Sequence, residues 1–233
     1  MGQAVETIPK SASVAVLTGA GISVPSGLAP FRGPGGMWND IDIEEYVTAE
    51  AFQRNRDKVI GFLHDMRKVA REAAPNGAHL ALARAEAVRE DNARFDIITQ
   101  NIDGLHARAG SRRVHEIHGS LEVERCEACG TLAAPGETGC PCGGRRRPHV
   151  VLFGEMLPED AVRATQVALQ GCDYFVAVGT SGFVWPAAGF VLEARSVGAR
   201  CINVNVEGSG NDAFHEELIG PAEEILPSLF GVR

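Results

Sequence analysis

Short apolar runs alternate with helical patterns along this chain of 233 residues. Nearly uninterrupted runs that end at Gly, Asn or Asp are typical of parallel strands buried on both faces of a sheet. Such runs occur at 14–18, 95–99, 150–153, 174–178 and 201–206. Apolar residues recur near helical spacing at 77–89, and a second helical pattern covers 159–170. The alternation predicts an α/β fold, a Rossmann-like doubly wound parallel sheet whose ligands bind beyond the carboxyl ends of the strands.

Two stretches interrupt this alternation. Residues 33–76 contain a Gly/Pro-rich loop and helical segments without a convincing strand, and residues 121–148 are dominated by cysteines. We expect these two inserts to form a smaller lobe over the sheet. The remaining segments, 1–32, 77–120 and 149–233, would then form one discontinuous Rossmann-like domain.

The composition limits the classes of partner. A net charge of -8 argues against nucleic acid, because phosphate binding needs clustered Lys and Arg. The acidic balance either favours basic, lysine-containing peptides or only aids solubility. No apolar run approaches the roughly 20 residues of a membrane span, and the first residues lack a signal pattern, so we expect a soluble, cytoplasmic protein. Nothing in the sequence indicates the oligomeric state.

Two polar loops follow predicted strands. Gly19-Ala20-Gly21-Ile22-Ser23 follows the first strand, and glycines there would let the backbone approach a pyrophosphate. The third glycine of the usual fingerprint is missing, so a tight turn without a ligand is the alternative reading. The second loop, Thr99-Gln100-Asn101-Ile102-Asp103-Gly104-Leu105-His106, precedes a lone His118-Gly119 step. The unperturbed pKa of a histidine side chain lies near neutrality, which suits a general base, although a lone histidine of this kind is more often structural.

Four of the six cysteines lie close together in the sequence. Cys126 and Cys129 form one pair, and Cys140 and Cys142 form a second. Two close pairs can supply four thiolates to one tetrahedral Zn²⁺, and a closed shell of four sulfurs leaves no open position for catalysis. We therefore predict one structural zinc ion in a reducing compartment rather than disulfides.

Together, these motifs resemble the sirtuins, the NAD-dependent protein lysine deacylases, over nearly the whole chain. The segment Ser23 to Trp38 is similar to the family's cofactor-covering loop, and Arg147 to Glu155 is similar to its substrate-pairing strand. The one-residue gap in Cys140-Pro141-Cys142 departs from the two CxxC pairs that are more usual there. The resemblance implies NAD as cofactor, one structural Zn²⁺ and acylated-lysine proteins or peptides as substrates.

The resemblance also implies roles for individual residues. His118 would be the general base, while Asn101 and Asp103 would orient a ribose hydroxyl and the nicotinamide carboxamide. Phe31 and Trp38 could instead be core residues of the small lobe. The implied NAD-binding residues are Gly19, Ala20, Gly21, Ile22, Ser23, Phe31, Arg32, Trp38, Gln100, Asn101, Ile102, Asp103, Gly179, Thr180, Ser181, Asn205, Val206, Glu207 and Ala222.

Substrate selection is where the chain departs from the branch that it resembles most, which removes acidic acyl groups such as succinyl. That branch places a Tyr and an Arg three residues apart on a helix, and here Leu63 and Met66 take those positions. Without the charged contact we expect a preference for neutral acyl groups. One alternative is that Arg67 or protonated His64 binds the acyl carboxylate. Another is that Leu63 and Met66 only pack in the core of the small lobe. The implied substrate residues are Leu63, Met66, Val151, Phe153, Gly154, Glu155 and Val184.

We therefore expect removal of acetyl or another neutral acyl group from lysine, giving nicotinamide, O-acyl-ADP-ribose and free lysine. A mono-ADP-ribosyltransferase would use the same cofactor loop and zinc. A binding module that only responds to NAD would not need His118.

Overall fold

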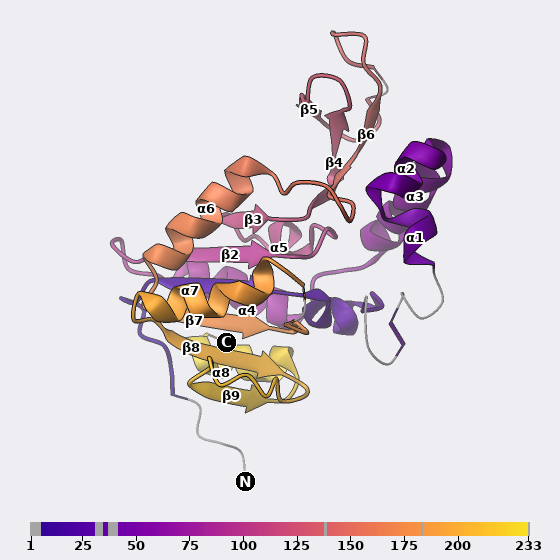
Figure 1. Cartoon of the computed structure of the whole chain (residues 1–233). Helices are drawn as coiled ribbons and strands as arrows, with labels where there is room; N and C mark the ends of the chain where they lie inside the picture. Colours follow the sequence, from indigo (N-terminus) through magenta and orange to yellow (C-terminus); the bar gives the residue numbers. More distant parts are fainter. Residues whose placement is uncertain (1–5, 31–34, 37–41, 138, 183, 233) are drawn as a thin grey trace.

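The computed structural model describes residues 6–30, 35–36, 42–137, 139–182 and 184–232. Its main body is a six-stranded sheet in which every neighbouring pair is parallel (Figure 1). The strand order is β3-β2-β1-β7-β8-β9, so the order reverses between β1 and β7. The strands are β1 (Val14–Thr18), β2 (Phe95–Thr99), β3 (Val114–Glu116), β7 (Tyr174–Val178), β8 (Arg200–Asn205) and β9 (Glu216–Ile219). This arrangement confirms the predicted Rossmann-like doubly wound sheet.

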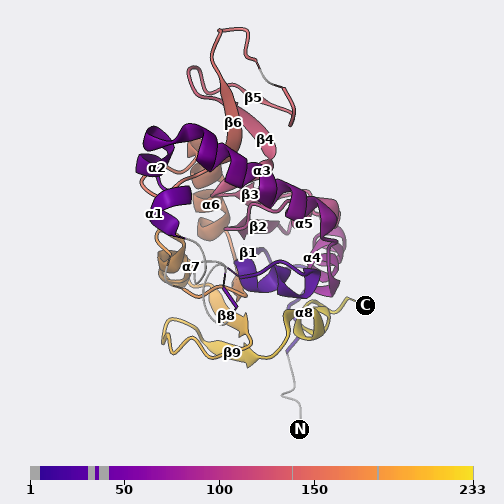
Figure 2. The ribbon, with the colours of Figure 1, turned by 90° about the vertical axis from the view of Figure 1, so that its right-hand side faces the viewer.

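Helices cover both faces of the sheet. On β1, Val14 and Val16 pack toward helices α4 (Gly77–Ala87) and α8 (Ala222–Phe230), since successive side chains alternate between faces. Ala15 and Leu17 pack toward α6 (Glu159–Gln170) and α7 (Phe190–Ser196) on the other face (Figure 2). Burial on both faces explains why the central strands β1 and β7 consist almost entirely of apolar residues.

A smaller lobe lies beyond one end of the sheet. Its helices are α1 (Ile43–Tyr46), α2 (Ala49–Arg54) and α3 (Arg56–Glu72). Its three-stranded antiparallel sheet, β5-β4-β6, projects from the molecule (Figure 1). Those strands are β4 (Gly119–Cys126), β5 (Leu132–Ala133) and β6 (Arg146–Val150). A third apolar cluster, which includes Leu63, Ile102, Leu121 and Leu152, joins this lobe to the loop after β2.

Three details differ from the sequence-based expectation. The run at 150–153 is not a strand of the parallel sheet, because its first residue ends β6, which pairs antiparallel with β4. The edge strands β3 and β9 were not predicted, because they are short and carry Glu and His among their apolar residues. The glycine loop leads into a 3₁₀ helix, Ala20–Ser26, with Pro25 inside it.

Two further short elements complete the fold: helix α5 (Leu105–Arg108) and the 3₁₀ helix η3 (Ala187–Gly189). Helix α4 begins at the N-cap Asn76, whose side chain accepts from the Ala78 amide, while the His79 side chain accepts from the Asn76 amide. No helix within the described part of the chain is both long enough and apolar enough to cross a membrane.

Candidate active site

The loops that follow the carboxyl ends of the strands line one cavity of about 1220 Å³. The cavity lies where the strand order reverses, the usual ligand position in an open α/β sheet. It is larger than the 300 to 1,000 Å³ of a typical small-molecule pocket, so it has room for more than one ligand. The predicted NAD-binding residues that line it are Gly19, Ala20, Gly21, Gln100, Asn101, Ile102, Gly179, Thr180, Ser181, Asn205, Val206, Glu207 and Ala222.

The glycines bring two of these loops into direct contact. A Cβ on Gly19 would lie 2.8 Å from the carbonyl oxygen of Gly179, and a Cβ on Gly21 would lie 2.7 Å from it. Gly179 itself has φ +58°, and a Cβ there would lie 2.5 Å from the amide nitrogen of Ile22. Larger residues would therefore separate the loops and change the floor of the cavity.

Asn101 presents an acceptor that the protein does not use. Its Nδ2 donates to the Gly19 carbonyl oxygen at 3.1 Å and to Ser23 Oγ at 3.3 Å. Its Oδ1 is buried and has no hydrogen-bond partner, although the residue lines the cavity. A buried acceptor without a partner costs stability unless a ligand supplies a donor. A carboxamide NH₂, as in nicotinamide, is such a donor, so Asn101 fits the cofactor implied by the sequence.

Three of the predicted cofactor residues lie behind the cavity wall. Ile22, Ser23 and Asp103 are buried and are not among the residues that line the cavity. Ser23 Oγ donates to Asp103 Oδ2 at 2.7 Å, and the Leu105 amide donates to Oδ1 at 2.9 Å. Asp103 therefore holds the loop after β2 against the glycine loop. Phe31, Arg32 and Trp38 lie outside the described residues.

His118 faces the same cavity from the segment between β3 and β4. Its Nδ1 lies 3.0 Å from the carbonyl oxygen of Gln100. Because a carbonyl can only accept, Nδ1 carries the proton and Nε2 of the neutral ring is free to accept one. Burial lowers the pKa of His118, and the hydrogen bond to Gln100 opposes that change. A neutral imidazole with a free Nε2 has the properties of a general base.

The glycine after this histidine is a steric requirement. Gly119 has φ +76°, and a Cβ there would lie 1.9 Å from the carbonyl oxygen of His149 on β6. The amide of Val151 donates to the His118 carbonyl oxygen at 2.9 Å. The His-Gly step thus joins His118 to the segment that follows β6.

Two other histidines of the region are structural. His106 Nε2 lies 2.9 Å from Thr18 Oγ1, and its ring centroid lies 4.9 Å from that of His79. Burial lowers the pKa of His106 to about 3 and that of His79 to about 4, so both rings are neutral near pH 7.

All seven predicted substrate residues line the cavity: Leu63, Met66, Val151, Phe153, Gly154, Glu155 and Val184. Phe153 joins the segment after β6 to the helical lobe through backbone hydrogen bonds with Val47 and Ala49, each of 2.9 Å. Arg147 Nη2 donates to both carboxylate oxygens of Glu155 at 2.7 Å. The Glu155 amide also donates to the Leu152 carbonyl oxygen at 2.9 Å, so these contacts hold the segment in a turn, with Leu63 and Met66 of α3 lining the same cavity.

His64 and Arg67, the two alternative residues for binding an acyl carboxylate, do not reach the cavity. His64 is exposed on the outer side of α3, and Arg67 is buried with its Nη2 2.7 Å from Glu124 Oε1. Neither residue lines the cavity. The cavity-lining residues that the sequence did not single out include Val47, Leu157 and Trp185. They carry no local signal, because only the fold brings them to this surface.

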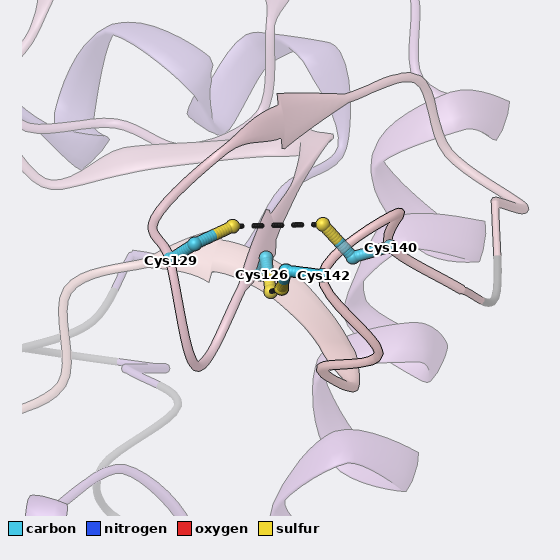
Figure 3. A group of neighbouring side chains, drawn as sticks. All are labelled: Cys126, Cys129, Cys140 and Cys142. Carbon is cyan, nitrogen blue, oxygen red and sulfur yellow. Dashed lines mark hydrogen bonds between the residues drawn. The ribbon is translucent and has the colours of Figure 1, made fainter.

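The four cysteines of the small lobe come together at the tips of its two loops (Figure 3). The Sγ atoms of Cys126 and Cys142 are 3.6 Å apart, those of Cys129 and Cys140 are 3.5 Å apart, and all four lie within 4.8 Å of one another. Tetrahedral Zn–S bonds of about 2.3 Å place sulfurs roughly 3.8 Å apart, so the four thiols fit one Zn²⁺. None of them lines the cavity, which supports a structural role.

The fold and the site define a class of protein: an α/β protein with a ligand cavity where the strand order reverses, a histidine that faces this cavity and four thiols that fit one zinc ion. The profile of the Sir2 family matches residues 19–186. An NAD-dependent protein deacylase from Caulobacter vibrioides is 43% identical over 228 residues, 92% of this chain and 94% of the relative. The mitochondrial deacylase sirtuin-5 of Danio rerio is 39% identical over 254 residues, 95% of this chain and 83% of the relative.

A solved structure gives the same result. A complex of a Sir2 homologue variant with ADP ribose has a TM-score of 0.86 and 34% identity, and the match covers 95% of this chain and 92% of that one. The chain belongs to the Sir2 family, and its enzyme class is that of the NAD-dependent protein deacylases.

Proposed function

We propose that this enzyme removes acetyl or another neutral acyl group from lysine side chains of proteins, and that it discriminates against acidic acyl groups. One observation carries the proposal: no Lys or Arg is found among the described residues that line the cavity. Its charged lining residues are Glu155, Glu207 and Glu223, together with the titratable His118. A succinyl or malonyl carboxylate would meet no cation there and would lose the hydration that it has in water.

Bound NAD would supply an electrophilic ribose carbon with nicotinamide as its leaving group. The residues for its nicotinamide end are Asn101, whose free Oδ1 accepts from a carboxamide, and Ile102 beside it. Thr180, Asn205 and Glu207 would hold the adenosine end, because they line the cavity just after the carboxyl ends of β7 and β8. Asp103 and Ser23 act through the loops that they join.

His118 moves the proton in this scheme. Its Nε2 would accept a proton from a ribose hydroxyl of the bound dinucleotide, which would make that oxygen a nucleophile toward the acyl group. The hydrogen bond from Nδ1 to the Gln100 carbonyl fixes the required tautomer and stabilises the imidazolium that forms. With one water molecule consumed, the expected products are nicotinamide, O-acyl-ADP-ribose and free lysine.

The acyl group would lie against the apolar wall of α3. Leu63 and Met66 are three residues apart and share one face of the helix. Losing a charge-assisted contact to an acyl carboxylate corresponds to about 1.5–3 kcal/mol, or roughly ten- to a hundredfold in preference. Met is flexible and apolar, so an acyl chain longer than acetyl also fits this wall.

The test uses one peptide sequence carrying acetyl-, butyryl-, myristoyl- or succinyl-lysine, incubated with NAD and followed by mass spectrometry. We expect free lysine and O-acyl-ADP-ribose from the neutral substrates, little desuccinylation, and no product with His118→Ala. Preferential desuccinylation would overturn the selectivity. ADP-ribose attached to protein, without loss of the acyl group, would identify a mono-ADP-ribosyltransferase instead.

A further inference from the structure

Helix α3 is joined to the zinc-binding hairpin by three Arg–Glu pairs. Arg56 Nη2 pairs with Glu127, Arg67 Nη2 lies 2.7 Å from Glu124 Oε1, and Arg71 Nε lies 2.8 Å from Glu122 Oε1. From the first pair to the third, the residue number of the arginine increases from 56 to 71, while that of the glutamate decreases from 127 to 122. The two segments therefore run antiparallel. We call these contacts the Arg–Glu ladder.

The middle pair differs from its neighbours in burial. The side chains of Arg67 and Glu124 are 10% and 6% exposed, those of Arg56 and Glu127 are 20% and 24% exposed, and those of Arg71 and Glu122 are 53% and 35% exposed. Exposed pairs contribute little, because water and salt screen them. A buried pair is different, because removal of one partner leaves an uncompensated charge. The middle pair therefore fixes the relative position of α3 and β4 more firmly than the exposed Arg71–Glu122 pair.

Arg67 also binds a carbonyl that the small sheet leaves free. The β4–β6 pairing breaks between Ser120 and Glu124. In this gap the Leu121 carbonyl oxygen accepts from Arg67 Nε, while the Leu121 amide donates to the Ile102 carbonyl oxygen at 3.0 Å. Arg67 is thus connected, through one residue of β4, to the loop that carries Asn101.

The turn of α3 that contains Arg67 also contains Leu63 and Met66, against which the acyl group would lie. Leu63 is one turn before Arg67, and Met66 is its immediate neighbour. Leu63, Leu121 and Ile102 belong to one apolar cluster, and Met66 packs against it. A shift of α3 along β4 would therefore move Leu63 and Met66 relative to His118 and the loop after β2.

We propose that Arg67 is a positioning residue that sets the depth of the acyl pocket by holding α3 on β4 through Glu124 and the Leu121 carbonyl. The proposal rests on the proposed function, because it takes Leu63 and Met66 as the acyl wall. It gives Arg67 a role in substrate selection without any contact between Arg67 and the substrate.

The experiment compares three variants. R67M/E124Q removes both charges together, so that no buried ion is left unpaired. R67K keeps the charge but loses the planar fork that reaches two acceptors. R71M/E122Q is the matched control, because it removes the exposed pair one turn further along the same helix.

For each variant we would measure the Kd of acetyl- and octanoyl-lysine peptides by calorimetry without NAD, then kcat and KM with NAD, melting temperature and zinc content. We expect R67M/E124Q to change the octanoyl-to-acetyl ratio of peptide Kd by about fivefold or more, the effect of losing at least one net hydrogen bond. The KM for NAD and the zinc content should stay at wild-type values. R67K should lie between wild type and the double variant, and R71M/E122Q should match wild type.

If R67M/E124Q has a lower melting temperature but an unchanged octanoyl-to-acetyl ratio of peptide Kd, Arg67 has only a structural role. The same conclusion follows if R71M/E122Q changes this ratio as much as R67M/E124Q does. If R67M/E124Q does not fold, the ratio measured with R67K decides between the same two roles. The wild-type enzyme tests the proposed function separately. If it prefers succinyl peptides, the neutral-acyl proposal fails, while the ratio of each variant to wild type still decides the role of Arg67.

Discussion

An arginine at position 66 should convert the enzyme toward acidic acyl groups. Met66 lines the cavity from α3, and the described lining residues include no Lys or Arg that could already bind a carboxylate. In Met66→Arg, the guanidinium would supply two parallel donors to a succinyl carboxylate. The gain for succinyl-lysine relative to acetyl-lysine should be about 1.5–3 kcal/mol, or roughly ten- to a hundredfold in the ratio of kcat/KM.

The loss of acetyl activity contributes to the same ratio. With an acetyl substrate, the introduced guanidinium would face an apolar group and keep no partner in the pocket, so kcat/KM for acetyl-lysine should fall. Adding Leu63→Tyr would provide a hydroxyl on the same face. Because Leu63 is fully buried, the larger ring should cost about 1–3 kcal/mol of stability through overpacking. The single Met66→Arg variant is therefore measured first.

The assay is a competition between succinyl- and acetyl-lysine peptides of identical sequence, with both O-acyl-ADP-ribose products quantified by mass spectrometry. His64→Arg is the matched control, because it adds the same charge on the exposed side of the same helix. Met66→Leu controls for the loss of the thioether. If Met66→Arg folds, retains zinc and still shows the wild-type ratio, then Met66 does not face the acyl group and the assignment of this wall is wrong.

The pKa of His118 is lowered by burial, so the acidic limb of kcat/KM should lie below the usual histidine value of about 6.5, and a pH–rate profile with the acetyl peptide measures it. Burial raises the pKa of Glu116 from 4.5 to about 7, so the folded state binds the proton more tightly, and its contribution to stability is lost as the pH rises from 4.5 to 7. Glu116→Gln removes this titration, and its melting temperature relative to wild type should be higher at pH 8 than at pH 5; equal differences at both pH values would contradict this reasoning. Metal analysis should find one zinc per chain, and Cys142→Ser should lose it together with the fold of the β4–β6 hairpin.

Local sequence patterns carried much of the prediction. Uninterrupted apolar runs identified β1, β2 and β7 with the bounds that the structure has, because strands buried on both faces admit few polar residues. The spacing of the cysteine pairs was equally informative, since four thiolates within one short segment have few other structural uses. The edge strands β3 and β9 were missed because an exposed edge imposes no such pattern.

The substrate side was only partly accessible. Helical spacing placed Leu63 and Met66 on one face of a helix, and both line the cavity. The same spacing could not show that Arg67 binds Glu124, because the register of α3 against β4 depends on contacts 57 residues apart. A long-range ion pair of this kind has no local signal.

The sequence by itself determined the alternation of strands and helices, the polar loops after the strands and the thiol set for zinc, since each depends on residues close together in the chain. Only the tertiary structure decided which groups face the ligand and which support them. It brought His118 Nδ1 to the Gln100 carbonyl, left Asn101 Oδ1 free, and turned Asp103 toward Ser23. These outcomes follow from the packing of loops from separate strands at one edge of the sheet, where the position of each side chain depends on its neighbours from distant parts of the chain.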